Sequence, residues 1–277
     1  MFTSVTKRAG DFFLRPKTNL PVEFPFGLKR GSKLYLKSLF YFIIGSLLPV
    51  GLFMGLLYAS VYLPFSLGEL LLAPQNQGLT LALVSAASFI CGFGMQVSVF
   101  RTALHSEGKR LRDTLGLNLE GVGGSVWKAI GLGLLTAMIG LGLEQLIELV
   151  YAAPPADPTA DFMGLLKGTG FLVMAGIALL APVMEEIIFR GFIFRMARAN
   201  LRAAAAFSNR PGLADWLAIG LSALIFGLMH MNFAALPFYI ALGAVFAESY
   251  RRTGCLYVPM VAHFVNNALV VLVLLLK

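Results

Sequence analysis

Seven long apolar runs divide this chain, and most are close to the length that a helix needs to cross a bilayer. A transmembrane helix takes about 20 mostly apolar residues to span a hydrocarbon core of about 30 Å. The runs occupy residues 39–63, 79–100, 129–151, 165–189, 214–233, 235–250 and 256–276. Of the 277 residues, 58% are hydrophobic and 13% are charged, whereas soluble domains average about 45–50% and 25%. We therefore expect an all-α fold, a polytopic transmembrane helix bundle with about seven spans.

Lysine and arginine are concentrated in alternate connections between these runs. The connections rich in basic residues are 1–38, 101–128, 190–210 and 251–252, and those without any are 64–78, 152–164 and 231–237. Cytoplasmic loops of membrane proteins carry an excess of lysine and arginine. The alternation predicts a cytoplasmic N-terminus and a C-terminus on the opposite side. The net charge of +8 is therefore interpreted as a topology signal, and no nucleic-acid partner is expected.

The chain is expected to form one membrane domain. Residues 1–38 hold eight lysines and arginines and are predicted to be a basic cytoplasmic N-terminal segment. Residues 39–277 are predicted to be the membrane-embedded helical domain. Cys91 and Cys255 lie in or beside apolar runs, so we expect small buried hydrophobes rather than a disulfide. No cleavable signal peptide is expected, because no early apolar run ends in a small-residue cleavage site.

A tandem pair of glutamates ends the fourth run. Ionisable groups are expensive inside a membrane, so each is a candidate functional residue. Glu186 and Arg190 are four residues apart and can form an ion pair on one helix face. Glu185 is rotated by about 100° from Glu186 and points elsewhere. One glutamate can thus be a neutralised structural partner while the other stays free for chemistry. Pro182 removes a helical hydrogen bond just upstream.

Two of the three histidines lie in the last three runs. Phe226 and His230 are four residues apart, which places an aromatic ring beside an imidazole. His263 and Asn267 repeat this spacing and put two hydrogen-bonding side chains on one face. The remaining acidic groups of the spans are interpreted as packing devices or groups that reach water at a span end. These are Glu144, Glu148 and Glu248.

Three short motifs carry a resemblance to a known family. Glu-Glu-Ile-Ile-Phe-Arg at 185–190, Phe-Gly-Leu-Met-His at 226–230 and His-Phe-Val-Asn-Asn at 263–267 are similar to the motifs EExxxR, FxxxH and HxxxN. These mark the CPBP membrane proteins, also called the Abi family, which include type II CAAX prenyl endopeptidases and bacteriocin-processing or immunity proteins. The resemblance covers residues 165–277, which would hold the catalytic core.

The resemblance implies an intramembrane endopeptidase. Carried over to this chain, Glu185 and His230 would activate a water, while His263 and Asn267 would steady the oxyanion. Glu186, Arg190 and Phe226 would support them. General chemistry agrees, because amide hydrolysis needs a base for water and donors for the developing negative oxygen.

Metal dependence and activity stay open at the level of sequence. Glu185, His230 and His263 could bind zinc and leave a position open, but no HExxH motif occurs, and we favour a metal-free, glutamate-type site. The alternative function is a non-catalytic membrane scaffold, immunity or regulatory protein of the same family. The expected partners are the membrane and a peptide or protein substrate, itself membrane-bound or lipid-modified. The family implies a prokaryotic plasma membrane.

One geometric condition must hold for these residues to meet. A simple ladder of spans places Glu185 near the inner end of its helix and His230 toward the outer end of the next. Convergence therefore requires the helix at 165–204 to continue well past Arg190, so that Glu185 lies near mid-depth.

Overall fold

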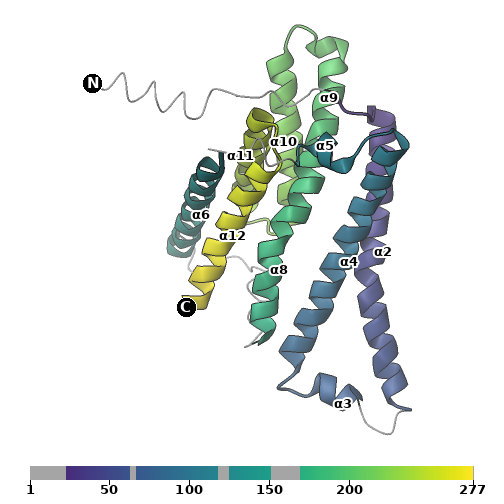
Figure 1. Ribbon diagram of the computed structural model, residues 1–277. Helices are drawn as coiled ribbons and strands as arrows, with labels where there is room; N and C mark the ends of the chain where they lie inside the picture. The colour runs from purple at the N-terminus through teal and green to yellow at the C-terminus, as the bar shows by residue number, and fades with distance from the viewer. Residues whose placement is uncertain (1–22, 63–66, 118–124, 151–168, 277) are drawn as a thin grey trace.

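Helices alone form the described part of this protein. The computed structural model describes residues 23–62, 67–117, 125–150 and 169–276, and no strand occurs among them (Figure 1). The long helices are α2 (Leu28–Ser60), α4 (Gln77–Ser106), α6 (Ser125–Val150), α8 (Thr169–Glu186), α10 (Pro211–Met229), α11 (Leu236–Thr253) and α12 (Tyr257–Leu276). The short ones are α3 (Leu67–Leu72), α5 (Leu111–Leu115), the π-helix η1 (Ile187–Phe194), α9 (Arg195–Ala203) and the 3₁₀ turn η2 (Ala205–Phe207). The predicted all-α polytopic bundle is confirmed.

Six helices of the described chain are long and apolar enough to cross a membrane. One of them is continuous from Gly170 to Ala203, because α8, η1 and α9 follow one another without a break. The expected run at 235–250 is α11, whose 18 residues end in a charged turn with Arg251 and Arg252. Together these helices agree with the expectation of about seven spans.

The surface of α2 shows why the bundle needs a bilayer. Leu47 and Leu52 are 61% and 63% exposed, and a soluble protein rarely leaves so continuous an apolar face uncovered. The helix has 33 residues and is therefore about 50 Å long, longer than a hydrocarbon core of about 30 Å. It begins at Leu28, so the last part of the basic segment 1–38 is the first turns of a membrane helix.

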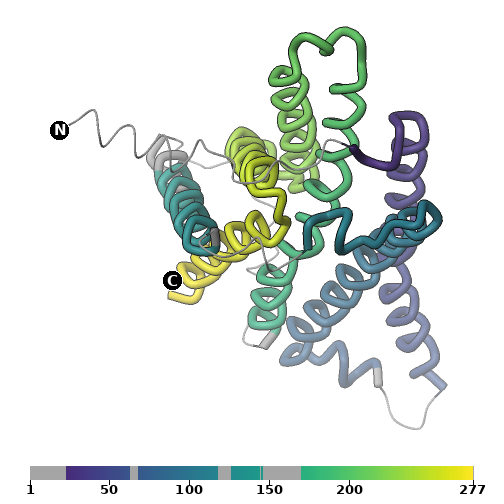
Figure 2. Tube along the Cα trace, turned by 45° about the horizontal axis from the view of Figure 1, so that its top comes forward, coloured from purple at the N-terminus to yellow at the C-terminus, as the bar shows by residue number. Residues whose placement is uncertain are grey.

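The other helices form three groups around α8: the pair α2 and α4, the pair α6 and α12, and a third group of α9, α10 and α11. The pair α2 and α4 lies on one side, and the pair α6 and α12 lies on the other (Figures 1 and 2). Helix α8 packs against both α4 and α12, while α10 packs against α11 and the segment η1–α9. Small residues permit the close contact of α2 with α4. A Cβ atom on Gly45 would lie 2.6 Å from the carbonyl oxygen of Cys91, a contact typical of membrane helix pairs.

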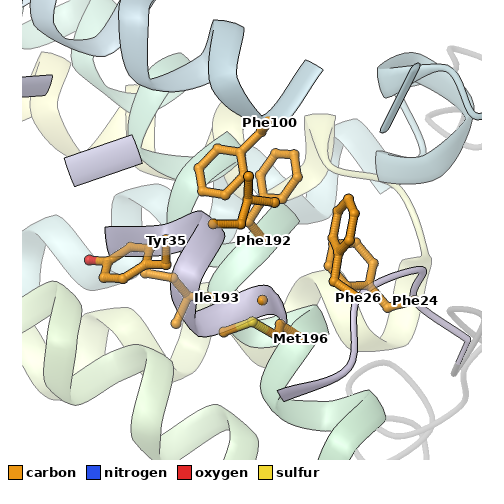
Figure 3. Close-up of a pocket in the computed structure, with 9 residues that line it drawn as sticks. Phe24, Phe26, Tyr35, Phe100, Phe192, Ile193 and Met196 are labelled. Carbon is orange, nitrogen blue, oxygen red and sulfur yellow. The ribbon is translucent and has the colours of Figure 1, made fainter. Parts of the chain in front are cut away.

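Aromatic side chains attach the residues before α2 to the centre of the bundle. Phe26 is 1% exposed, and Phe24 packs edge-on against Phe192 of η1 with ring centroids 6.0 Å apart. Phe192 in turn stacks on Phe100 of α4 at 3.8 Å (Figure 3). These rings line a cavity of about 10 Å³ that is almost wholly apolar. The cavity is part of the packing around η1 and offers no polar group for chemistry.

Charged side chains hold α9, α10 and α11 together at one end. Asp215 of α10 contacts Arg198 and Arg202 of α9 at 2.9 and 2.6 Å, and Arg251 of α11 at 3.6 Å. Glu248 pairs with Arg251 at 2.6 Å, which agrees with its expected structural role. The side chains of Glu144 and Glu148 lie outside the described residues. Cys91 and Cys255 are free thiols, as expected.

Candidate functional site

The Glu186–Arg190 ion pair lies at the junction of α8 and η1. Arg190 Nη1 is 2.9 Å from Glu186 Oε1, and both side chains are fully buried. Arg190 Nη2 also donates to the carbonyl oxygen of Gly243 in α11 at 3.1 Å. The rings of Phe226 and Phe246 lie 4.3 and 5.3 Å from the guanidinium carbon. The spacing of the two residues predicted this pair, and its burial means that neither charge can be left alone without a large penalty.

The arginine belongs to a π-helix, a conformation that is rare and often marks functional sites. All eight residues of η1 are buried. Ser222 of α10 donates its hydroxyl to the carbonyl oxygen of Phe189 at 2.9 Å and ties η1 to that helix. The helical segment then continues to Ala203. The condition set by the sequence is met, because Glu185 lies well inside a long membrane segment.

His263 of α12 contacts both glutamates of α8. Its Nδ1 is 3.0 Å from Glu186 Oε1, and its Nε2 is 3.9 Å from Glu185 Oε2. An ionised carboxylate can only accept a hydrogen bond, so Nδ1 carries the proton. Phe246 stacks on the imidazole with centroids 4.8 Å apart. His263 is thus fixed by one glutamate and presents its other nitrogen toward the second.

Glu185 differs from its neighbour in having no cationic partner at bonding distance. Its Oε2 atom is buried and makes no hydrogen bond with any described residue, although the side chain is 17% exposed. Its ion-pair contact among the described residues is with the imidazole of His263, at 3.9 Å. The sequence expectation of one neutralised glutamate and one free glutamate therefore describes the arrangement well. An unpaired buried carboxylate is unfavourable for stability and is available to a water or a substrate.

His230 is held from two sides at the C-terminal end of α10. Its Nδ1 lies 2.9 Å from the carbonyl oxygen of Phe226, so this nitrogen carries the proton and Nε2 keeps its lone pair. Tyr239 of α11 stacks on the imidazole at 4.2 Å. The Phe226 ring contacts both imidazoles, with centroids 4.6 Å from His230 and 5.7 Å from His263. Phe226 is therefore the link between the two histidines.

Glu185 and His230, which the sequence predicted to activate a water together, are not in direct contact. Neither an ion pair nor a hydrogen bond joins these two side chains within the described part of the chain. The structure brings His263 to Glu185 instead, and His230 reaches the group through Phe226. A shared water between Glu185 and His230 stays a prediction.

Asn267 completes the group from α12. Its Nδ2 donates to the carbonyl oxygen of Ala178 in α8 at 2.8 Å. The side chain of Asn266, 5% exposed, donates through its own Nδ2 to Asn267 Oδ1 at 3.2 Å. The motif residue is thus anchored at both ends of its amide.

The zinc alternative was tested against the positions of the candidate ligands. Within the described ranges, no three histidine, cysteine, aspartate or glutamate side chains are grouped closely enough to hold a metal ion. In particular, Glu185, His230 and His263 are not gathered as a ligand set in this arrangement.

Several residues of this group carried no clear sequence signal. Tyr239 stacks on His230, Phe246 stacks on His263, and the carbonyl of Gly243 accepts from Arg190. All three belong to α11, which the motifs do not touch. Their spacing of three to four residues puts them on one helix face, but only the packing of α11 against α10 and η1 reveals what that face contacts.

The fold and this group of residues define a class of protein. A membrane-spanning helix bundle carries, inside its helices, a neutralised Glu–Arg pair, an unpaired glutamate, two histidines and an asparagine. Residues 167–269 match the family described as type II CAAX prenyl endopeptidase Rce1-like. This C-terminal part of the chain is therefore similar to that family, in agreement with the resemblance carried by the three motifs.

Curated relatives agree with this assignment. The chain is 26% identical over 149 residues to the membrane-embedded CAAX protease MroQ of Staphylococcus aureus strain USA300, covering 51% of this chain and 58% of MroQ. It is 26% identical over 163 residues to YdiL of Bacillus subtilis strain 168, named as a candidate membrane peptidase, covering 58% of both chains. The chain thus matches somewhat more than half of each relative's length. No solved structure shows significant similarity.

Proposed function

We propose that this protein is an intramembrane endopeptidase that hydrolyses a peptide bond with a water activated by Glu185. The observation that carries the proposal is the contrast within the glutamate pair. Glu186 is neutralised by Arg190 at 2.9 Å and contacts His263 at 3.0 Å, whereas the only ion-pair contact of Glu185 among the described residues is with His263 Nε2 at 3.9 Å. If the only role of this site were structural, the ion pair of Glu186 with Arg190 would be sufficient and the carboxylate of Glu185 would not be needed.

The proposed reaction begins with proton removal from water. Glu185 takes a proton from a water while the oxygen attacks the carbonyl carbon of the substrate. His230, protonated at Nδ1, offers the lone pair of Nε2 to the same water as an acceptor. The proton taken from water is then delivered to the leaving amine, so the peptide bond breaks and Glu185 returns to its ionised form.

The developing negative oxygen requires fixed donors. Asn267 has two N–H groups on its amide nitrogen, and only one is used by the Ala178 carbonyl. The second is available for the oxyanion. His263 holds Nδ1–H on Glu186 and directs Nε2 toward Glu185, so it donates to the oxyanion only in molecules whose Nε2 has already taken a proton from solvent, separate from the proton that Glu185 removes from water. Donors of this kind act strongly in a water-poor site, where charge is poorly screened.

The substrate class follows from the site's position and the family. Glu185 lies within a membrane-spanning segment, so the scissile bond must reach the bilayer. A peptide or protein that is membrane-bound or lipid-modified satisfies this requirement. CAAX-type C-terminal peptides are the first class to test, because the matching family and MroQ carry that designation.

The first prediction concerns Glu185→Gln, which keeps the side chain's shape but cannot accept the proton. Turnover of prenylated and unmodified CAAX peptides and of a peptide library should fall by about 10²–10⁴-fold, the usual contribution of a general base. Binding, measured by peptide anisotropy, should persist. Glu107→Gln, at an exposed position paired with Arg30, is the control and should retain turnover. Equal turnover of Glu185→Gln and wild type would rule out Glu185 as the base, whereas a wild type that binds these peptides without cleaving them would support the scaffold function.

The second prediction concerns metal. We expect chelators to leave cleavage intact and the purified protein to lack stoichiometric zinc by elemental analysis. The reasoning is that, among the described residues, the three candidate ligands are not grouped closely enough to hold one ion. One zinc per chain that is lost together with activity would establish the metallopeptidase alternative.

A further inference from the structure

Pro182 lies inside α8, between Ala178 and Glu185. A proline has no backbone N–H, so the carbonyl four residues earlier in the helix loses its usual partner. In α8 that carbonyl belongs to Ala178. A buried carbonyl in a bilayer must find another donor, because no water is at hand to supply one.

Asn267 supplies the donor from the neighbouring helix. Its Nδ2 is 2.8 Å from the Ala178 oxygen. The proline therefore has a consequence beyond its own helix: it creates the acceptor that fixes the amide of Asn267. Without the proline, the backbone N–H of residue 182 would compete for the same oxygen.

Asn266 fixes the other end of that amide. Its Nδ2 donates to Asn267 Oδ1 at 3.2 Å, while its own Oδ1 is buried and has no hydrogen-bond partner in the described chain. An unpaired buried carbonyl oxygen lowers stability. Asn266 is thus a poor choice for stability alone, and the contact it provides is the one to Asn267.

We propose that Pro182 and Asn266 are positioning residues of the site that act through Asn267. The two bonds set the plane of the Asn267 amide, so that its free N–H keeps one direction. The inference rests on the proposed function, in which that N–H serves the oxyanion. It adds two residues that neither the motifs nor the family assignment marks for this role.

The proposal makes activity and stability change in opposite directions. Pro182→Ala restores the helical hydrogen bond to Ala178, and Asn266→Leu removes a buried unpaired oxygen. Each should leave the melting temperature in detergent equal to or above that of wild type. Each should lower kcat by about tenfold or more, the effect of one lost hydrogen bond in the transition state, with KM nearly unchanged.

A cycle with Asn267→Ala tests whether the effect passes through that residue. In the Asn267→Ala background, Pro182→Ala and Asn266→Leu should change kcat by less than about twofold. Matched controls are Pro49→Ala, a proline inside α2, and Gln96→Leu, a buried amide of α4 that contacts Ser38. Both controls should retain kcat in either background. Losses in kcat that persist in full without Asn267 would overturn the proposal.

Thermal unfolding supplies a test that needs no activity. Pro182→Ala should raise the melting temperature more in the Asn267→Ala background than in wild type, because the Ala178 oxygen then has no other partner. If wild type cleaves no peptide, the proposed function fails, yet this coupling should still appear. Additive shifts in melting temperature would overturn the positioning role even in an active enzyme.

Discussion

At the scale of single residues, Glu185 and Glu186 share a peptide bond and have opposite surroundings. Glu186 is fully buried between Arg190 and His263. Glu185 has no arginine partner among the described residues and lies 3.9 Å from His263 Nε2, although each glutamate keeps one oxygen without a hydrogen bond there. The helical rotation of about 100° between neighbours separates the two roles.

The third prediction is a double-mutant cycle on the buried ion pair. Glu186→Gln or Arg190→Met alone should lower the free energy of unfolding by about 3–5 kcal/mol, because each leaves a buried charge without its partner. Removing both should cost less than the sum of the two single changes. Unfolding of the purified protein by heat or denaturant measures the effect.

The exposed pair Arg30 and Glu107 is the matched control for this cycle. Their atoms are 2.5 Å apart, but the side chains are 56% and 31% exposed. Exposed pairs contribute about 0–1 kcal/mol, so removing either partner should have little effect. Additive effects at Glu186 and Arg190 would mean that the two charges are stabilised independently.

Residue-level prediction succeeded where the partners lie on one helix. The spacing of Glu186 and Arg190 was sufficient to predict their contact, and that of Phe226 and His230 predicted the ring contact. The approach of His263 to both glutamates depends on how α8 and α12 pack. Sequence spacing within one helix has no information on that packing, so the contact could be proposed only through the family resemblance.

At the scale of elements, η1 and α11 meet through Gly243. The carbonyl of Gly243 accepts from Arg190, and a Cβ atom on this glycine would lie 2.9 Å from Ala223 Cα in α10. Real Cβ atoms do not approach a backbone atom so closely. The absence of a side chain therefore lets α11 come near enough to α10 for its backbone to contact the buried guanidinium.

The fourth prediction follows from this contact. Gly243→Ala should lower the free energy of unfolding by about 1–3 kcal/mol, the range for overpacked sites. It should also lower turnover, because α11 carries Tyr239 and Phe246 against the two histidines. Gly220→Ala in α10 is the control, since a Cβ there meets nothing within 4 Å. Its stability should be unchanged or slightly higher, which thermal unfolding of both variants would check.

The helices were predictable as elements, whereas the π-helix was not. Each apolar run corresponds to a helix with ends a few residues away, with two exceptions: α2 begins at Leu28 rather than near residue 39, and the helical segment of the fourth run continues to Ala203. Helix propensity does not distinguish i→i+4 from i→i+5 hydrogen bonding. The conformation of η1 depends on contacts such as Ser222 with Phe189 and Phe100 with Phe192, which only the assembled bundle provides.

At the scale of the whole molecule, the orientation in the membrane is the fifth prediction. The distribution of lysine and arginine predicts residues 101–128 on the cytoplasmic side and both 152–164 and the C-terminus on the other side. Reporter fusions or cysteine labelling at Pro155 and Lys277, which lie outside the described residues, can measure this. Labelling of either position only from the cytoplasm would reverse the orientation and move the entrance of the site to the other leaflet.

The order of the helices along the chain affects how the protein is made. Glu185 is synthesised with α8, but His263 and Asn267 arrive with α12, after α10 and α11 have emerged from the ribosome. Glu186 and Arg190 can enter the bilayer together as a neutral pair during this interval. The nascent chain therefore lacks the proposed oxyanion donors, and no imidazole of α12 lies beside Glu185, until α12 has been inserted. If the proposed function holds, incomplete chains are expected to be inert toward neighbouring membrane proteins throughout their biogenesis.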